Sequence, residues 1–441
     1  MFDTICAISS GGVVNQPIGI IRISGPDTFT IIKKIFKGKF ENKRGIYYGH
    51  IHDKNEIIDE VVLITFENPN SYTGEDLVEI NAHGGLIVLQ KIIELIFTNG
   101  ARAAEPGEFT RRAFLNGKID LIKADAIHEL IFSKTETQAK ASVKKFSGQT
   151  SKFIQELISD LQMLIGHLEV NIDYPEYDDI EILDEEKLIN KVLKILDKEK
   201  KAIELSEKAS VIFEGIKVAI VGKPNSGKSS LLNLLLNEEK AIVTNIPGTT
   251  RDIINGEFQY QGILFQINDS AGIRNHSSDV VENIGIERSL KLINESKIII
   301  HLIDAIEGET EVDKLITEQS KDKKYIKVFS KSDLLEKLDA EKIYISSKEK
   351  NIDNLLDLMV SEYKNLDLDN EKVLIGARQM SLLKSSYEAL NDAYNALSNG
   401  LTADIVITDI TKAWEDLINI SGKADNELLL DEIFKNFCLG K

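Results

Sequence analysis

The sequence has only two cysteines, Cys6 and Cys438, and they stand almost the full length of the chain apart. This scarcity excludes a disulfide framework and a cysteine-based zinc site, and it fits a reducing compartment. No apolar run approaches the roughly 20 residues that a membrane-spanning helix needs. The first residues also lack the basic segment and apolar stretch of an export signal. We therefore expect a soluble, cytoplasmic protein that does not enter a membrane.

Positive charge is also scarce, because 53 Lys and Arg residues stand against 71 Asp and Glu residues and the net charge is −18. A surface with general affinity for nucleic acid is excluded, since neutralising phosphates requires many cations. Any contact with RNA must then use a local basic patch. One candidate group is Lys33, Lys34, Lys37, Lys39, Lys43 and Arg44, and a second is Arg111 with Arg112. The alternative for either group is a solvated face.

The length of 441 residues is too great for one ordinary core, and at roughly 150 residues per domain it predicts two or three domains. Residues 1–118 contain short β-rich runs, such as Ile18–Ile23 and Val61–Phe66, broken by Gly, Pro and Asn. One helical stretch covers Gly85–Thr98. This pattern predicts an α+β domain.

Helical periodicity dominates residues 119–210 and returns in residues 365–441, where no proline occurs. The apolar face of the first helical region is Phe153, Leu157, Leu161, Leu164 and Leu168, continued by Leu188, Val192, Ile195 and Leu196. Pro175 and several carboxylates predict a loop at residues 173–179. Between the helical regions, in residues 211–364, apolar β-type runs alternate with helical ones, which predicts a mainly parallel sheet. We therefore expect an α/β domain inserted into a helical domain.

A phosphate-binding loop, Gly222–Ser229, stands between the apolar run Lys217–Val221 and the helical run Ser230–Leu236. Its glycines let successive backbone N–H groups surround phosphate oxygens, and the following helix adds its N-terminal dipole. Lys228 would reach the β- and γ-phosphates, and Ser229 would bind Mg²⁺. The residues predicted to contact the nucleotide here are Asn225, Ser226, Gly227, Lys228, Ser229 and Ser230.

A second motif, Asp269–Gly272, follows the run Ile263–Ile267. In P-loop enzymes a carboxylate at the first position supports the Mg²⁺ shell and the Gly272 amide would contact the γ-phosphate. Ile273 stands where many small GTPases carry the glutamine that orients the attacking water, so another group must do this. The candidates, among which nothing physical in the sequence chooses, are Glu282, Asp279, Glu287, Arg251 and Arg274.

The base is predicted from the segment Ser330–Asp333, which follows the run Tyr325–Phe329. Asp333 can accept both N–H donors of the Watson–Crick edge of guanine, and adenine has no matching pair. The sequence therefore favours GTP over ATP. Ser330 is shorter than the Asn that usually begins this motif. The sequence therefore does not predict the hydrogen bond that this Asn makes to the imidazole side of guanine. Further nucleotide contacts are expected from Lys331, Ser346, Ser347 and Lys348.

Several longer segments resemble the MnmE (TrmE) family, the bacterial and organellar tRNA-modification GTPases. In the second half of the chain these are Gly248–Asp252, Asp269–Arg274, Ile284–Arg288 and Phe437–Lys441. In the first half they are Gly19–Gly25, Ser71–Glu79 and Pro106–Phe109, with Asp120 and Leu121. The resemblance covers nearly the whole chain, and the terminal Cys-x-Gly-Lys combined with a phosphate loop is its most specific feature.

The resemblance implies a fold and a reaction. The fold would be an N-terminal domain (1–118) that binds a tetrahydrofolate derivative and forms a homodimer, a helical domain (119–210 with 365–441) and an inserted G domain (211–364). The derivative would be 5-formyl- or methylene-tetrahydrofolate. In a heterotetramer with MnmG (GidA), which uses FAD and NADH, the family adds an aminomethyl or carboxymethylaminomethyl group to C5 of the wobble uridine of certain tRNAs.

The resemblance also assigns residues. It places Arg22, Glu79, Lys118 and Lys441 at the folate. It places K⁺ at Asn225, Thr244, Ile246 and Thr249, and it pairs Thr250 with Ser229 at Mg²⁺, so that Thr244, Thr249 and Thr250 join the nucleotide site. Glu282 matches the residue that orients water, and Arg274 is a further catalytic candidate. Cys438 is either a reactive thiol near the folate or an inert residue.

Two other functions are open to a chain of this kind. A ribosome-assembly GTPase would have a similar G domain, but it typically carries a basic RNA-binding module, and no Gly-x-x-Gly loop in a basic context occurs here. A regulatory switch would hydrolyse GTP and use residues 1–118 only for dimerisation. Binding of folate by residues 1–118 separates the modification enzyme from the switch.

Overall fold

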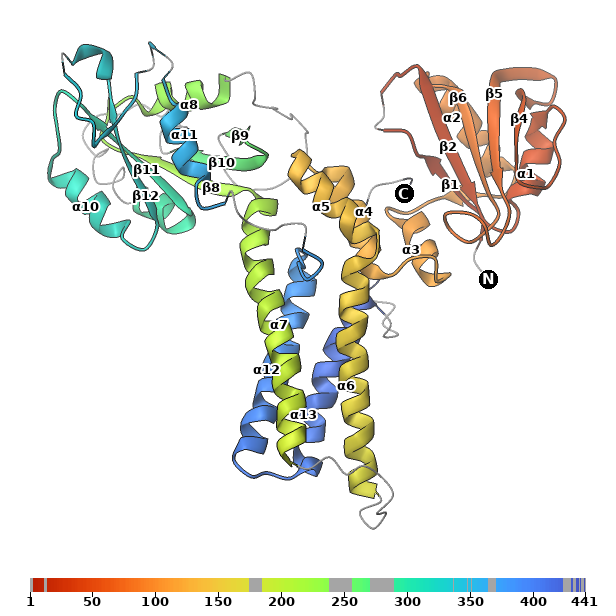
Figure 1. Cartoon of the computed structure of the whole chain (residues 1–441). Helices are drawn as coiled ribbons and strands as arrows, with labels where there is room; N and C mark the ends of the chain where they lie inside the picture. Colours follow the sequence, from red (N-terminus) through yellow and green to blue (C-terminus); the bar gives the residue numbers. More distant parts are fainter. Residues whose placement is uncertain are drawn as a thin grey trace. The chain divides into compact units, whose positions relative to one another are not determined.

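The computed structural model describes residues 3–11, 14–173, 185–237, 256–269, 289–335, 337–346, 348–349, 351–363, 370–422, 430, 434–435, 437 and 440, without the side chains of 171, 173, 185, 237, 268, 269 and 403. The chain forms two compact units, which we describe separately (Figure 1). Unit 1 comprises Met1–Ile131, Lys145–Leu183 and Asn395–Lys441, and unit 2 comprises Phe132–Lys144 and Asp184–Tyr394. None of the helices in these ranges has both the length and the apolar composition that a bilayer span requires.

Unit 1 begins with a seven-stranded sheet in the order β3-β4-β5-β6-β2-β1-β7. The strands are β1 (Ile5–Ile8), β2 (Ile18–Ser24), β3 (Phe36–Lys37), β4 (Gly45–Asp53), β5 (Glu56–Phe66), β6 (Leu77–His83) and β7 (Arg102–Ala103). Alternate residues of β2, β5 and β6 are buried against α1 (Thr28–Ile35) and α2 (Leu86–Thr98), which cover one face. The predicted α+β domain is confirmed.

The described residues of unit 1 also form α3 (Glu108–Leu115), α4 (Leu121–Phe132), α6 (Gln149–Asp173) and α13 (Ala403–Ser421). The predicted apolar face of α6 is buried from Phe153 to Leu168, and α13 packs along this helix (Figure 1). The last described residues also belong here, because Leu430 and Phe434 are buried in one cluster with Leu121 of α4.

Unit 2 contains a six-stranded sheet in the order β13-β12-β11-β8-β10-β9. The strands are β8 (Ile216–Val221), β9 (Gly256–Tyr260), β10 (Ile263–Asp269), β11 (Ile298–Asp304), β12 (Lys324–Ser330) and β13 (Ile343–Tyr344). Every pairing is parallel except β9 with β10, which is antiparallel. The predicted, mainly parallel sheet is confirmed, and β9 is the strand that periodicity did not reveal.

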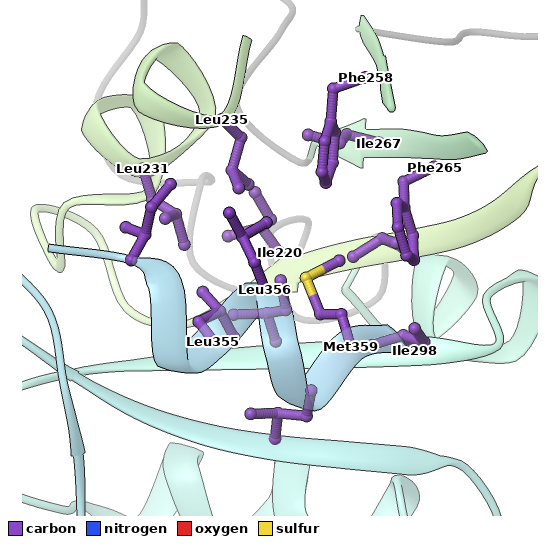
Figure 2. Packing of buried hydrophobic residues seen from close by; sticks show 14 of the residues in the cluster. Ile220, Leu231, Leu235, Phe258, Phe265, Ile267, Ile298, Leu355, Leu356 and Met359 are labelled. Carbon is purple, nitrogen blue, oxygen red and sulfur yellow. The ribbon is translucent and has the colours of Figure 1, made fainter. Parts of the chain in front are cut away.

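Helices cover both faces of this sheet. On one face α8 (Lys228–Asn237) contributes Leu231 and Leu235, and α11 (Asp353–Val360) contributes Leu355, Leu356 and Met359 (Figure 2). On the other face, Ile316 of α10 (Glu311–Gln319) and Ile293, which precedes β11, pack with Ala219 and Val221. Because β8 is buried on both sides from Val218 to Val221, this part of the strand is a continuous apolar run.

Within the part of unit 2 that the structure describes, the other α-helices are α5 (Glu136–Phe146), α7 (Glu185–Glu214) and α12 (Ala377–Ser398). The Ser386 hydroxyl of α12 donates to Glu199 of α7 at 2.7 Å, and both residues are buried. Since α7 precedes the sheet in the chain and α12 follows it, the predicted helical domain interrupted by an α/β domain is confirmed. The predicted loop at 173–179 lies outside the described residues, apart from the helical Asp173.

Candidate functional site

The phosphate loop connects β8 to α8, at the carboxyl end of a strand buried in the middle of the sheet. Gly222 has φ 146°, and a Cβ added there would lie 2.3 Å from the carbonyl oxygen of Leu302 in β11. Asn225 and Gly227 are also left-handed, with φ of 65° and 96°. The loop thus needs glycine where the sequence has it, and the predicted strand-loop-helix arrangement is confirmed.

The side chains of the loop are arranged to receive anionic groups. Lys228 Nζ donates to the carbonyl oxygen of Gly222 at 2.9 Å and to that of Lys223. Its ammonium therefore lies over the loop itself. Asn225 and Ser229 are exposed, Ser229 in the first turn of α8, whereas Ser226 is buried. An exposed hydroxyl beside a helix N-terminus and a lysine is a suitable ligand for a phosphate-bound Mg²⁺.

Asp333 lies in the short helix η1 (Ser332–Leu334), directly after β12. One carboxylate oxygen accepts from the Ser346 hydroxyl at 3.0 Å, and the other lies 3.0 Å from Lys348 Nζ. Hydrogen bonds from Lys348 and Ser346 hold the pKa of the Asp333 carboxyl below its usual range. An ionised carboxylate accepts hydrogen bonds and donates none, so it fits the paired N–H donors of guanine.

Lys331 extends this edge of the sheet. Its backbone is left-handed at φ 61°, and its ammonium forms an ion pair with Asp304 at the end of β11. Burial opposes ionisation of Asp304, but the hydrogen bond and charge of Lys331 act together with the backbone N–H groups of Ile306 and Glu307, and the pKa of Asp304 is lowered. Strands β8, β11 and β12 are neighbours, so the loop, Lys331 and Asp333 all follow the carboxyl ends of adjacent parallel strands. This is the edge at which α/β sheets bind ligands.

The Ser330 side chain occupies a place that the sequence did not predict. Its hydroxyl donates to the carbonyl oxygen of Ser226, in the phosphate loop, at 2.7 Å. The two residues are 104 positions apart in the chain, so no local signal could have indicated this contact.

Many of the residues expected at the nucleotide lie outside the described residues: Thr244, Ile246, Thr249, Thr250, Gly272, Arg274, Glu282 and Ser347. The same is true of the competing candidates Asp279, Glu287 and Arg251. The backbone of Asp269 ends β10, where it pairs with Ile220 of β8. Within the described ranges, no group of three or more His, Cys, Asp and Glu side chains gathers as a metal site.

A second candidate site lies on the sheet of unit 1. Arg22 of β2 and Glu79 of β6 are cross-strand neighbours, and Arg22 donates to Oε1 of Glu79 from Nε at 3.0 Å and from Nη2 at 2.7 Å. The guanidinium also lies over the rings of Tyr72 and Phe109, 5.5 and 5.6 Å from their centroids. A fixed carboxylate beside aromatic rings suits the N–H donors and flat ring of a pterin.

The end of the chain reaches this pair. The carbonyl oxygen of Gly440 accepts from Arg22 Nη1 at 3.1 Å and from the Ser9 hydroxyl at 2.9 Å. Gly440 has φ 90°, and a Cβ there would lie 2.3 Å from the carbonyl oxygen of Ile8 in β1. The residues on either side, Cys438 and Lys441 among them, lie outside the described residues.

Lys118, also expected at the folate, makes a separate contact. Its Nζ donates to the carbonyl oxygen of Pro69 at 2.8 Å, and its stem lies beside Gly74. The structure therefore brings Arg22 and Glu79 into direct contact and gives Lys118 a different partner.

Arg112 does not form part of an exposed basic patch, contrary to the expectation from the sequence. As a candidate for a basic RNA patch it would have to be exposed, but its side chain is 1% exposed. It pairs instead with Asp3, Glu75 and Glu108, at 3.1, 3.1 and 2.9 Å. Burying a cation requires such partners. The spacing of Glu108 and Arg112, four residues apart in one helix, was the available signal for an ion pair.

The other basic group remains a candidate surface. Lys33 and Lys34 lie in the last turn of α1, Lys37 lies in β3, and Lys39, Lys43 and Arg44 precede β4; all six are exposed. Residues 33–44, which we call the basic segment, contain one carboxylate, Glu41, and it pairs with Lys43. The segment is therefore positively charged, whereas the chain as a whole has a net charge of −18.

Cys6 is a buried thiol in β1, 1% exposed. Burial raises its pKa to about 12, so the thiolate form that reacts is negligible near neutral pH.

Two sequence-family models match the chain. The one described as GTP-binding protein TrmE N-terminus matches residues 4–118, and the one described as MnmE helical domain matches residues 121–438. Two similar proteins bear the name tRNA modification GTPase MnmE. That of Mycoplasmopsis pulmonis is 55% identical and that of Mycoplasma mobile 50% identical, each over 444 residues, covering 100% of both chains.

Among solved structures, Era of Aquifex aeolicus bound to GDP·AlF4⁻ is 27% identical to this chain. The alignment covers 39% of this chain and 66% of that one, with a TM-score of 0.27.

Proposed function

This chain belongs to the MnmE family of tRNA modification GTPases, and from that premise we propose that it hydrolyses GTP while the wobble uridine of tRNA is modified. The observation that carries the proposal is the edge of the parallel sheet in unit 2. There the phosphate loop and the ionised Asp333 follow strands of one sheet, with β11 between them. This arrangement can bind phosphates at one end and select guanine at the other.

For hydrolysis, the proposal gives each loop residue a role. Lys228 would contact the β- and γ-phosphates. Ser229 and Thr250 would hold Mg²⁺, and the carboxylate of Asp269 would support the shell of ligands around it. K⁺ would be held by Asn225, Thr244, Ile246 and Thr249. Glu282 would orient the attacking water. When bound, the two cations offset the negative charge that develops on the phosphates. The exposure of Asn225 and Ser229 supports their share in this assignment.

The second site would bind the one-carbon donor, 5-formyl- or methylene-tetrahydrofolate. Glu79, held by Arg22, would accept hydrogen bonds from the pterin, and Lys118 and Lys441 would pair with the glutamate tail. The contact of Gly440 with Arg22 supports a role for the chain end, because it brings the neighbour of Lys441 to this pair. A tetrahydrofolate supplies the carbon that extends C5 of the uridine, as an aminomethyl or carboxymethylaminomethyl group.

Partners and domain limits complete the proposal. The chain would form a homodimer through residues 1–118 and a heterotetramer with MnmG, which supplies FAD and NADH, in the cytoplasm where tRNA is modified. The helical domain would comprise 119–210 and 365–441, and the G domain 211–364. The family match that ends at residue 118 supports the first of these limits. The basic segment would contact the tRNA backbone.

Nucleoside mass spectrometry of tRNA from cells that lack this protein tests the proposal. We expect the modified wobble uridine to disappear and to return with the unaltered chain, but not with Lys228→Ala. Lys314→Ala, which removes an exposed lysine of α10 in the same unit, is the control and should restore it. An unchanged wobble uridine would overturn the proposed function, and altered ribosome assembly with normal uridine would favour the ribosome-assembly alternative.

A further inference from the structure

Ser330 stands at the end of β12, where guanine-binding motifs usually have Asn. Its side chain is buried, 5% exposed. Its hydroxyl oxygen lies 2.7 Å from the carbonyl oxygen of Ser226 and 3.2 Å from that of Ile303. A serine hydroxyl has one hydrogen to donate, and the shorter distance assigns it to the phosphate loop.

The bond acts on one peptide unit of the loop. Ser226 lies between the left-handed residues Asn225 and Gly227, and its carbonyl belongs to the peptide that carries the N–H of Gly227. In a planar trans peptide, C=O and N–H point in opposite directions. A carbonyl held by Ser330 therefore fixes the direction of the Gly227 N–H, one of the amides that a phosphate loop offers to its ligand.

The remaining contacts also tie the loop to the sheet. A Cβ on Gly227 would lie 3.8 Å from Cβ of Ser330, so Gly227 faces this side chain. At the other end of the loop, Gly222 lies against the carbonyl of Leu302 in β11. The loop is thus anchored on β11 at its start and on β12 near its end.

We propose that Ser330 is a positioning residue, whose hydroxyl orients the Ser226–Gly227 peptide for phosphate binding, so that base selection rests on Asp333 and not on Ser330. The inference rests on the proposed binding of GTP by this loop. The shorter side chain of Ser330 thus has its own role in place of Asn. Its hydroxyl hydrogen is donated to the phosphate loop and aligns the phosphate site.

Binding of GTP and ITP to purified full-length variants tests this inference, because hypoxanthine lacks the exocyclic amino group that Asp333 would bind. Ser330→Ala, and Ser330→Cys with its weak donor, should weaken GTP and ITP alike by about tenfold, the value of one net hydrogen bond. The GTP/ITP ratio should stay unchanged. Ser330→Thr keeps the hydroxyl and should keep the affinity. Asp333→Asn should instead change the ratio.

Ser320→Ala is the matched control. Ser320 is a buried serine of the same unit, and its hydroxyl donates to the carbonyl of Ile316 at 2.7 Å, away from the loop. It should lower thermal stability comparably and leave both affinities unchanged. A loss confined to GTP in Ser330→Ala, or no loss in both Ser330→Ala and Ser330→Cys, would overturn the inference. Failure of the unaltered chain to bind GTP would instead contradict the proposed function.

Discussion

Gly440 lets the end of the chain lie directly against β1, because it has a hydrogen atom where other residues have a side chain. Its φ of 90° and the 2.3 Å approach to the Ile8 carbonyl exclude a Cβ for two separate reasons, backbone conformation and space. The carbonyl of this residue is then available to Arg22 and Ser9. One residue therefore decides whether the chain end reaches the Arg22–Glu79 pair.

We predict that Gly440→Ala weakens binding of 5-formyltetrahydrofolate by at least tenfold, because the added methyl group forces residue 440 away from β1. Isothermal titration calorimetry measures the affinity. Gly400→Ala is the matched control: Gly400 is also left-handed, at φ 79°, but a Cβ there meets nothing within 4 Å. Both variants carry about 1–2 kcal/mol of backbone strain. Equal folate affinities in the two variants would contradict the role of the chain end.

Secondary structure explains the position of some cations in the basic segment but not of others. Lysines in the last turn of α1 interact favourably with the negative end of the helix dipole. A lysine on the edge strand β3 disfavours pairing of this strand with another chain. Lys43 pairs with Glu41, but neither reason applies to Lys39 or Arg44, which lie between the strands. These residues are the ones whose charge an anionic partner would explain.

We predict that Lys39→Glu combined with Arg44→Glu weakens tRNA binding and lowers the salt dependence of the affinity. Each lost phosphate contact reduces the slope of log K against log salt by about 0.7–0.9. Fluorescence anisotropy at several salt concentrations measures both quantities. The control pair is Lys91→Glu with Lys200→Glu, two exposed lysines outside the segment. If both pairs reduce binding equally, the effect is that of net charge, and the segment is only a solvated face. GTP hydrolysis without tRNA should not change.

At the scale of the whole molecule, the two candidate sites belong to different compact units, the nucleotide edge to unit 2 and the Arg22–Glu79 pair to unit 1. Turnover of GTP can affect the proposed one-carbon chemistry only if the units, or the protomers of the proposed dimer, respond to the nucleotide.

We predict that GTP hydrolysis is severalfold faster in K⁺ than in Na⁺ buffer, and that Asn225→Gly removes the difference. Glycine deletes the amide ligand but keeps the left-handed backbone, φ 65°, without strain. Steady-state phosphate release at equal ionic strength measures both rates, with the Na⁺ rate of each variant as its own reference. Equal rates in K⁺ and Na⁺ for the unaltered chain would contradict the cation mechanism.

The sequence alone determined most of the elements, though not β9, and the nucleotide loop. Strands such as β8 and helices such as α6 follow from apolar spacing over neighbouring residues, and the phosphate loop is a local motif whose glycines meet local backbone demands. The tertiary structure alone decided three features that join distant parts of the chain. These are the contact of Ser330 with Ser226, 104 positions apart, the contact of Arg22 with Gly440, 418 positions apart, and the burial of Arg112 among carboxylates. The physical reason is that periodicity reports which face of an element is buried, whereas a hydrogen bond between elements depends on how their backbones are placed in space.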